Sequence, residues 1–336
     1  MSTHSVDVIK IQEVLPHPNA DRLEIIKIEE YTCCVRKGDF KAGDLAAYIE
    51  PDYVVDIERP EFSFVPRPRI KVKKLRGIIS QGLIIPAPEG SQEGDNVMEQ
   101  LGVTRYVPPM NGINRPKFRA MGEKAPEGYH PKYDLENWRK YSRLLEEGEE
   151  VFITEKIHGA NARFKHDGEK MHLGSRSMWV KDDQTNPWSL ALEQNPWIRS
   201  FCENNPNLTV YGEIFGWVQD LKYGHSEKEI SFAAFDILQG NRWWDYDEIS
   251  SIFAPLNCLD PSFEFQEGKH LWSVPILCQE LYSKDIIREL VDGKSEIPGA
   301  DHIREGIVVK PIRERTDVRL GRVALKVVSD DYLERH

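Results

Sequence analysis

Six short runs in this sequence carry residues that could do chemistry, and they follow one another along the chain. They are EKIHGANARF around Lys156, GSRS around Arg176, YGEIFG around Glu213, SFAAFDI around Asp236, EGIVVK from Glu305 to Lys310, and ALKVVS around Lys326. A lysine amine can act as a nucleophile once its proton is gone, and carboxylates are ligands for hard divalent cations. Each run alone says little, because K-x-x-G occurs by chance about once in every few hundred residues. The informative feature is therefore the ordered set.

That order resembles motifs I, Ia, III, IIIa, IV and V of the covalent nucleotidyltransferases, the superfamily of ATP-dependent ligases and mRNA capping enzymes. The resemblance implies that Lys156 attacks ATP and carries AMP. Because a free lysine is protonated at neutral pH, burial or a nearby cation must lower its pKa. Gly159 would allow a close backbone approach beside the nucleotide. Further implied nucleotide contacts are Glu155, Ile157 and Asn161.

The same resemblance assigns roles to charged residues of the later motifs. It implies phosphate contacts for Arg176, Lys310 and Lys326. Glu213 and Glu305 resemble the carboxylates of motifs III and IV, with Glu213 also close to the nucleotide. Each acid alone would be read as structural, but two acids from different strands suit Mg²⁺ or Mn²⁺, which prefer oxygen ligands.

The run SFAAFDI offers two aromatic residues for stacking on adenine. Phe232 and Phe235 alternate with smaller residues along a predicted strand. We expect Phe232 to stack, because it begins the motif. The alternative is that both rings belong to the hydrophobic core.

Two details narrow the resemblance. His158 stands where DNA ligases carry an acid, and a histidine at this place resembles the double-strand-acting RNA ligases of the phage editing type. Those enzymes have two lysines in motif V, however, where ALKVVS has the single Lys326. The chain ends soon after this motif, so we expect no C-terminal OB domain of the kind that capping enzymes carry. The whole chain most resembles ATP-dependent RNA ligases with an N-terminal OB module and a C-terminal adenylyltransferase domain. By this resemblance Arg139 and Asn186 would contact the triphosphate.

The elements that precede these motifs form a β-rich N-terminal module. Short apolar runs alternate with Pro, Gly, Asn and Asp over residues 1–105, which predicts a small barrel, and LPHPNADRLEII resembles the opening strands of OB-fold tRNA-binding modules. The run PRPRIKVKKLRG is strongly basic, and alternation would place several charges on one strand face. A solvated strand edge is the alternative, but here we expect nucleic-acid contacts from Arg67, Arg69, Lys71, Lys73 and Arg76, with Lys74 in the same run.

The domain organisation follows from these patterns. A Pro- and Gly-rich linker is predicted at residues 106–121, and an adenylyltransferase domain at residues 122–336. An amphipathic helix is predicted for YDLENWRKYSRLL, whose apolar residues recur every three or four positions. The predicted fold class is α+β: an OB-like β-barrel followed by an ATP-grasp-like ligase domain of antiparallel sheets with flanking helices.

Composition sets the outer limits. The 336 residues carry a net charge of −11, which argues against indiscriminate nucleic-acid binding. Five cysteines without C-x-x-C spacing indicate neither a disulfide framework nor a zinc site. With no signal peptide or apolar span, we expect a cytoplasmic protein without membrane contact, and a monomer.

Together these patterns predict an ATP-dependent RNA ligase that seals 3′-hydroxyl/5′-phosphate nicks in RNA repair. Its expected partners are ATP, Mg²⁺ or Mn²⁺, and RNA or an RNA-containing nicked duplex. The rival enzymes are a DNA ligase and a capping guanylyltransferase. The rival from another class is an RNA-binding protein whose transferase domain is inactive.

Overall fold

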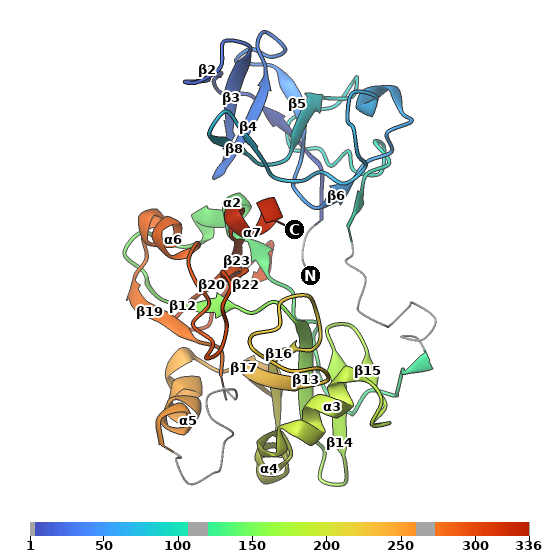
Figure 1. Ribbon diagram of the computed structural model, residues 1–336, viewed down its shortest axis with the longest axis vertical. Coiled ribbons are helices and arrows are strands. Elements are labelled where there is room, and N and C mark those ends of the chain that lie inside the picture. The colour runs from blue at the N-terminus through green and yellow to red at the C-terminus, as the bar shows by residue number, and fades with distance from the viewer. Residues whose placement is uncertain (1–3, 107–119, 260–272, 336) are drawn as a thin grey trace. The chain divides into compact units, whose positions relative to one another are not determined.

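The computed structural model describes residues 4–106, 120–259 and 273–335, and the chain divides into two compact units (Figure 1). The larger unit holds the described residues of 109–136 and 143–329. The smaller unit holds those of 2–108, 137–142 and 330–336. The predicted linker at 106–121 lies almost entirely outside the described residues.

Short antiparallel strands build the smaller unit. Its strands are β1 (Asp7–Lys10), β2 (Leu15–Pro16), β3 (Leu23–Ile28), β4 (Tyr31–Arg36), β5 (Leu45–Ile49), β6 (Tyr53–Val54), β7 (Lys73–Leu75), β8 (Ile78–Ser80), β9 (Leu83–Pro86) and β10 (Thr104–Arg105), with a 3₁₀ turn, η1, at Pro60–Phe62. They pair as β1-β5-β9, β2-β3-β4, β10-β6 and β7-β8. Alternate side chains point into two apolar clusters, one around Ile49 and Phe62 and one around Ile26 and Tyr31. This arrangement agrees with the short, punctuated apolar runs of the sequence.

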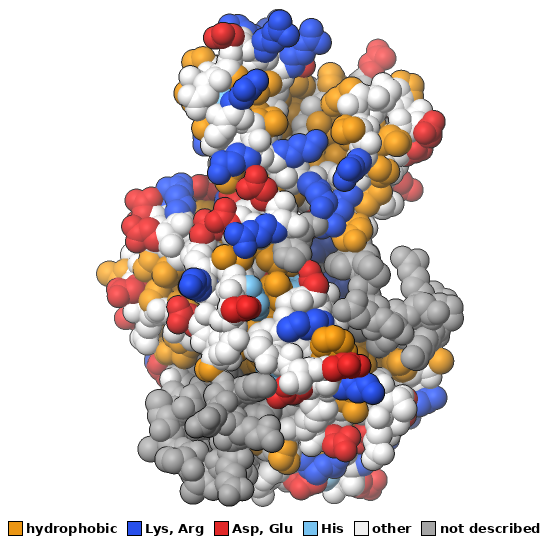
Figure 2. Space-filling model, viewed as in Figure 1, with side chains coloured by type: hydrophobic (Ala, Val, Ile, Leu, Met, Phe, Trp, Pro, Cys, Tyr) orange, Lys and Arg blue, Asp and Glu red, His pale blue; other side chains and the backbone are white. Residues whose placement is uncertain are grey.

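The basic run of the smaller unit is only partly a strand. Residues 73–75 form β7, and Arg76 occupies the turn to β8 with a φ of 49°. Ile70 and Val72 are buried while the basic residues between and beside them are exposed or half-buried, so the predicted alternation holds without a continuous strand. Figure 2 shows Lys and Arg side chains spread over the visible face of this unit.

Two segments distant from the N-terminus complete the smaller unit. They are α2 (Trp138–Tyr141) and α7 (Asp330–Arg335). Lys140 Nζ lies 2.6 Å from Asp7 Oδ2 and 3.5 Å from Glu50 Oε1. These ion pairs join α2 to the N-terminal strands, and Gln81 Nε2 donates to Asp330 of α7 at 2.7 Å, so the unit extends beyond the predicted boundary at residue 105.

The helix predicted for YDLENWRKYSRLL is shorter than the apolar spacing indicated. Residues Glu136–Asn137 form strand β11, α2 spans one turn, and a 3₁₀ turn, η2, follows at Ser142–Leu144. The Asn137 side chain accepts a hydrogen bond from the backbone N–H of Arg139 and so caps the helix at its first turn. The helix therefore begins five residues later than the start of that run.

Two antiparallel sheets form the frame of the larger unit. Their strands are β12 (Glu150–Lys156), β13 (Ala160–His166), β14 (Met171–Ser175), β15 (Trp179–Val180), β16 (Leu208–Gly216), β17 (Ile230–Gln239), β18 (Arg242–Trp243), β19 (Ile276–Leu281), β20 (Gly306–Pro311) and β23 (Leu325–Val328). One sheet has the order β11-β23-β20-β12-β19 and the other β15-β14-β13-β16-β17-β18. A separate hairpin pairs β21 (Thr316–Asp317) with β22 (Gly321–Arg322).

Two helices, α3 (Pro187–Gln194) and α4 (Pro196–Asn204), pack on the six-stranded sheet and bury its main hydrophobic core (Figure 1). Each begins at an N-P-W sequence, because Pro suits the first helical turn. In its described part, this unit also has α5 (Tyr246–Leu259) and α6 (Lys284–Leu290). Among the described residues, no helix has the length and apolar character needed to cross a membrane.

A β-bulge interrupts β17 where it passes the site. Tyr211 of β16 is paired with Asp236, and its neighbour Gly212 with Ala234, so Phe235 has no partner on β16. Such an extra residue changes which side chains face which side of the sheet. Phe232, Ala234 and Ile237 therefore face the core under the helices, while Phe235 and Asp236 face the other way.

Candidate active site

A pocket of about 130 Å³ lies within the larger unit and is lined from both sheets. Its lining residues are Tyr133, Asp134, Leu135, Thr154, Glu155, Lys156, Ile157, Asn161, Arg176, Glu213, Phe235, Val274, Val308, Lys310 and Lys326. Eight of the residues predicted as site residues thus converge: Glu155, Lys156, Ile157, Asn161, Arg176, Glu213, Lys310 and Lys326. The lining combines amines, carboxylates and two aromatic rings around a single small volume.

Lys156 stands at the end of β12 and forms an ion pair with Glu305, which directly precedes β20. In the antiparallel register Lys156 is opposite Gly306, which brings Glu305 alongside. The Lys156 Nζ–Glu305 Oε1 distance is 2.5 Å, and both side chains are largely buried. A motif I lysine and a motif IV acid, separated by almost half of the chain, are therefore in direct contact.

The pKa values of the two predicted metal ligands, Glu213 and Glu305, are shifted in opposite directions. Burial and the nearby charge of Glu305 raise the pKa of Glu213 to about 8, although Lys156 opposes this rise. Burial also disfavours ionisation of Glu305, but the charges of Lys156 and His158 outweigh it and lower its pKa to about 2. The ionised form of Glu213, which burial and Glu305 disfavour, would gain from a bound cation.

His158 connects this acid to the loop that follows β16. Its Nε2 lies 2.6 Å from Asp220 Oδ1, and its Nδ1 lies 3.6 Å from Glu305 Oε2. Burial disfavours the charged imidazole, but these two carboxylates raise the pKa of His158. The histidine that distinguishes KIHG in the sequence thus bridges two acids in the structure.

The donor set suits a divalent cation that is shared with a substrate. Within the described part of the chain, no three His, Cys, Asp or Glu side chains converge tightly enough to hold an ion by themselves. Mg²⁺ usually binds through one or two carboxylates together with water and phosphate oxygens. Glu213 and Glu305 fit that kind of site and not a closed protein cage.

The stacking prediction for Phe232 is wrong. This ring is fully buried, stacked on Trp197 at 5.6 Å and edge-on to Phe164 at 5.0 Å. Phe235 lines the pocket instead and packs against Tyr133 with ring centroids 4.4 Å apart. The alternation along β17 separates the two rings, because residues an odd number apart face opposite sides of a sheet.

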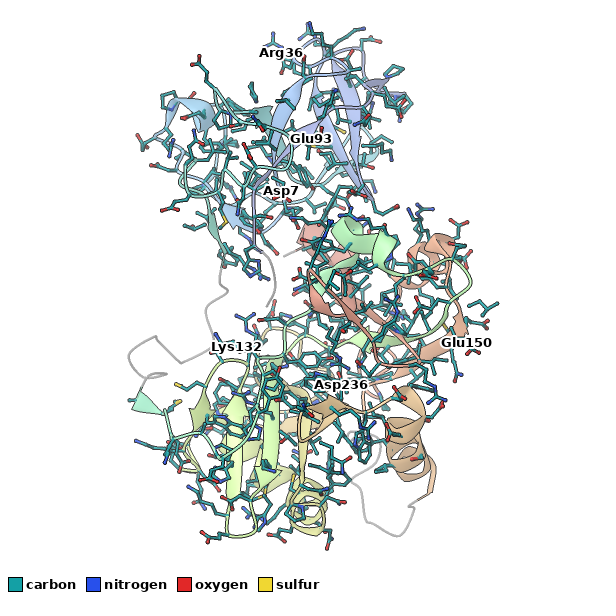
Figure 3. All side chains as sticks on the ribbon, turned by 180° about the vertical axis from the view of Figure 1, so that it is seen from behind. Asp7, Arg36, Glu93, Lys132, Glu150 and Asp236 are labelled. Atoms are coloured by element: carbon teal, nitrogen blue, oxygen red, sulfur yellow. The ribbon has the colours of Figure 1, made fainter. Side chains whose placement is uncertain are left out.

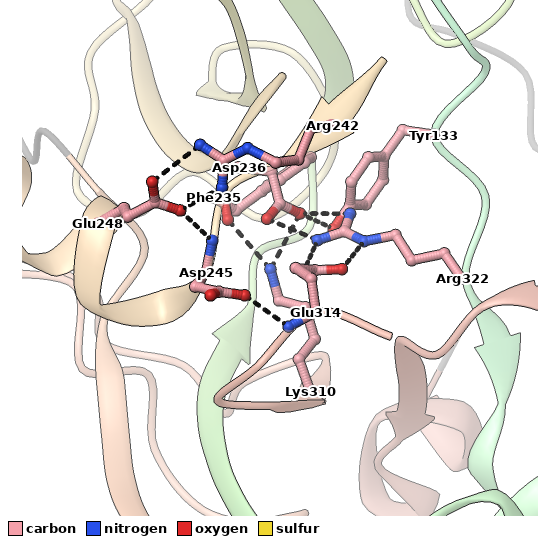
Figure 4. Close-up of polar contacts among 9 residues, drawn as sticks. All are labelled: Tyr133, Phe235, Asp236, Arg242, Asp245, Glu248, Lys310, Glu314 and Arg322. Atoms are coloured by element: carbon pink, nitrogen blue, oxygen red, sulfur yellow. Dashed lines mark hydrogen bonds and ion pairs between the residues drawn. The ribbon is translucent and has the colours of Figure 1, made fainter. Parts of the chain in front are cut away.

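Lys310 is held by a buried carboxylate. Its Nζ lies 2.9 Å from Asp236 Oδ2 and 3.1 Å from the carbonyl oxygen of Phe235. Arg322 contacts both oxygens of Asp236, at 2.8 and 2.9 Å, and the Tyr133 hydroxyl donates to the same carboxylate (Figure 4). Lys310 therefore fixes the wall of the pocket that carries Phe235.

Asp236 lies inside the larger unit (Figure 3), with no solvent exposure. Arg322 continues the network to Glu314 and stacks over Trp243 at 4.3 Å. The three cationic and hydroxyl donors leave Asp236 compensated, as a buried charge requires. Tyr133 and Arg322 were not found from the sequence, since neither lies in one of the six runs.

Two further predicted contacts are placed elsewhere. Asn186 is fully buried and caps α3: its oxygen accepts from the N–H groups of Trp188 and Ser189, and its amide donates to Lys181 and Asp183. Its polar atoms are thus committed to the fold. Arg139 belongs to the smaller unit, where it pairs with Asp330 at 3.1 Å, and it does not line the pocket.

Two predicted nucleotide contacts near Lys156 differ in what their side chains do: one supports the fold, and the other is available to a ligand. The Glu155 carboxylate accepts hydrogen bonds from Ser295 and from the backbone of Glu296, so its side chain supports the strand. Asn161 lines the pocket, and its buried Oδ1 has no hydrogen-bond partner among the described residues. An orphaned acceptor of this kind indicates a donor supplied by a ligand.

Gly159 is required by the scaffold. A Cβ at this position would lie 2.1 Å from the carbonyl oxygen of Ile214 on the neighbouring strand. The close approach predicted for this glycine is real, but it is an approach to β16. It brings Lys156 and Glu213 to the same pocket.

Comparison with known proteins decides the family. The family model of RNA ligases matches residues 149–328, more than half of the chain and all of the strands that line the pocket. The chain belongs to the RNA ligase family. A second model, of an OB-fold domain, matches residues 5–87, so the predicted α+β architecture with an N-terminal OB fold is confirmed. A comparison with curated proteins gives no match.

Solved RNA ligases share the fold over nearly the whole length. A variant of Naegleria gruberi RNA ligase with ATP and manganese has a TM-score of 0.79 and 25% identity, covering 99% of each chain. The same enzyme with pyrophosphate gives a TM-score of 0.77 at 26% identity, again over 99% of each chain. Another variant, with AMP and manganese, gives 0.78 at 26% identity over 99% of each chain.

Proposed function

We propose that this RNA ligase is ATP-dependent and seals 3′-hydroxyl/5′-phosphate nicks in RNA-containing duplexes, in RNA repair, through a lysyl-AMP intermediate. The observation that carries the proposal is the contact between Lys156 and Glu305 in a pocket that also holds Glu213, Lys326 and Phe235. These are the parts that nucleotidyl transfer needs: a nucleophile, carboxylates for a cation, a phosphate-binding charge and a ring for the base. The similar ligases with ATP, AMP, pyrophosphate and manganese support it.

In the first step the Lys156 amine attacks the α-phosphorus of ATP. An N–P bond forms, the bond to pyrophosphate breaks, and the Lys156 ammonium gives up two protons to solvent while one N–H stays on the phosphoramide nitrogen. Lys156 must first leave its ion pair with Glu305. A divalent cation held by Glu213 and Glu305 would neutralise phosphate charge when bound. Lys326 and Arg176 are placed to contact the phosphates, and Asn161 Oδ1 to accept from the ribose or another ligand donor.

The second step takes place at the phosphorus of AMP, and the third step at the 5′-phosphate of the nick. A 5′-phosphate oxygen attacks the AMP phosphorus and displaces the Lys156 amine, which gives an adenylylated 5′ end. A 3′-hydroxyl then attacks that 5′-phosphate, and AMP leaves. Because all three steps are phosphoryl-type transfers, the protein acts mainly by positioning and charge stabilisation.

The smaller unit is proposed to bind the nucleic acid. Its run from Arg67 to Arg76 places Lys73 and Lys74 on the exposed β7, where they can meet phosphates. Arg69 pairs with Asp52 at 2.8 Å and lies over the Tyr106 ring. We assign the domains as predicted, with α2 and α7 added to the OB unit.

We further propose a monomer that works in the cytoplasm. The described cysteines Cys33, Cys34, Cys202 and Cys278 are all free thiols. Reduced thiols suit a reducing compartment.

Sealing assays test this function. The protein is incubated with ATP, Mg²⁺ or Mn²⁺, and a nicked duplex whose nick is all RNA, all DNA or mixed. We expect sealing whenever the 3′-hydroxyl strand is RNA. Sealing of all-DNA nicks at an equal rate would favour a DNA ligase, and covalent label from GTP but not ATP would favour a capping enzyme.

A further inference from the structure

The loop after β16, residues 217–224, is tied to the backbone directly after the nucleophile. Gln219 Nε2 donates to the carbonyl oxygen of Gly159 at 2.8 Å. The backbone N–H of His158 donates to the Tyr223 hydroxyl at 2.7 Å, and the same histidine pairs with an aspartate of the loop. These contacts fix the Trp217 loop, as we call residues 217–224, beside Lys156.

The loop carries an exposed aromatic ring with a half-buried cation beside it, whose ammonium also donates to the carbonyl oxygen of Gln219. Trp217 is 43% exposed, whereas tryptophan is highly buried on average. Lys222 Nζ lies 4.2 Å from the centroid of its ring. The backbone N–H of Trp217 donates to the carbonyl oxygen of Glu229 at 2.8 Å, so the exposed ring stands on a fixed backbone. An exposed ring with a nearby ammonium can stack a base and meet a phosphate.

Neither Trp217 nor Lys222 lines the pocket that takes the nucleotide. The polynucleotide, however, must bring its 5′-phosphate to the AMP on Lys156, and it therefore passes over the residues that adjoin Lys156. The Trp217 loop adjoins them.

We propose that Trp217 and Lys222 bind the polynucleotide end that receives AMP, with a base or sugar against the indole and a backbone phosphate near the ammonium. This inference rests on the proposed ligase function. It adds a binding site that acts after lysyl-AMP has formed. Its occupant is an RNA or RNA-containing strand carrying a 5′-phosphate.

Single-turnover transfer tests the proposal. Protein already carrying AMP is mixed with a 5′-phosphorylated nicked RNA duplex, and the rate of AMP transfer is compared with the rate of lysyl-AMP formation. Trp217→Ala should lower this ratio roughly tenfold, since base stacking on an aromatic side chain is worth about 1–3 kcal/mol. Trp217→Phe should restore most of it, and Lys222→Gln should weaken duplex binding more at low salt than at high salt.

The matched control is Tyr129→Ala, which removes a ring that is 57% exposed in the same unit and does not line the pocket. It should leave the ratio unchanged. The lysyl-AMP reaction also reports that each variant is folded. If wild-type protein transfers AMP and Trp217→Ala transfers it equally well, this inference is overturned. If the wild-type protein forms no lysyl-AMP, the proposed function itself fails.

Discussion

Lys310 Nζ lies 2.9 Å from Asp236 Oδ2, and both side chains are buried. The motif resemblance assigns Lys310 to the α-phosphate, but its ammonium is already paired. A cation locked in this way shapes the pocket by holding Asp236 and the carbonyl oxygen of Phe235. We propose that Lys326, which lines the pocket on the neighbouring strand opposite Val308, contacts phosphate.

Removing the charge of Asp236 should destabilise the protein strongly. Asp236→Asn leaves Lys310 and Arg322 buried without their counter-ion, and breaking such a group costs about 3–5 kcal/mol. The free energy of unfolding, from urea denaturation, measures this. The control Glu248→Gln breaks an ion pair with Arg242 whose side chains are substantially exposed, which should cost no more than about 1 kcal/mol. Equal effects of the two substitutions would contradict the account.

The stability gap between wild type and Asp236→Asn should depend on pH. Burial opposes ionisation of Asp236, but Arg322 and Lys310 lower its pKa to about 2, whereas an unfolded Asp titrates near about 3.9. A lowered folded pKa gives stability that is present above the unfolded pKa and is lost as pH falls through the folded one. The gap should therefore be constant from about pH 7 to 5 and shrink below about pH 4. Denaturation series at these pH values measure it, and a gap that grows on acidification would be inconsistent.

Substitution of Phe235 should affect nucleotide binding, whereas substitution of Phe232 should affect stability. Phe235→Ala removes the ring in the pocket and should raise the KM for ATP in lysyl-AMP formation, by an amount set by stacking of about 1–3 kcal/mol. Phe232→Ala empties a core position and should cost about 3–5 kcal/mol of stability. Adenylation kinetics and thermal melts of both variants check this. The reverse pattern would restore Phe232 as the stacking residue.

The basic run of the smaller unit should set the salt dependence of duplex binding. Replacing Lys73 and Lys74 by Gln should weaken binding and reduce the slope of log affinity against log salt by about 0.7–0.9 for each lost phosphate contact. Fluorescence anisotropy with a labelled nicked duplex measures the slope. The control replaces Lys37 and Lys41, which are also exposed in this unit. If both pairs change the slope equally, the run has no special role.

The sequence was sufficient to predict which charged residues of the six runs come together. Lys156, Glu213 and Lys326 lie in short runs, and antiparallel pairing brings those runs to one pocket. Phe232 failed because motif order does not tell which face of β17 a side chain takes, and a bulge at Phe235 alters the alternation there.

Other misses have a similar physical origin. Asn186 looks like a ligand in the sequence, but the start of a helix uses its polar atoms. Tyr133 was missed because its partner, Asp236, is about a hundred residues away in the chain. Long-range partners of this kind are fixed by tertiary packing, which a single sequence does not display.

The central claim is that Lys156 carries AMP. Protein incubated with ATP and Mn²⁺ or Mg²⁺, without nucleic acid, is digested under conditions that preserve the phosphoramide bond, and the peptides are analysed by mass spectrometry. We expect one AMP on the peptide that contains Lys156, no adduct on Lys156→Ala, and loss of the wild-type adduct when pyrophosphate is added. An AMP adduct on any other residue, or an unmodified Lys156 under both metals, would contradict the account.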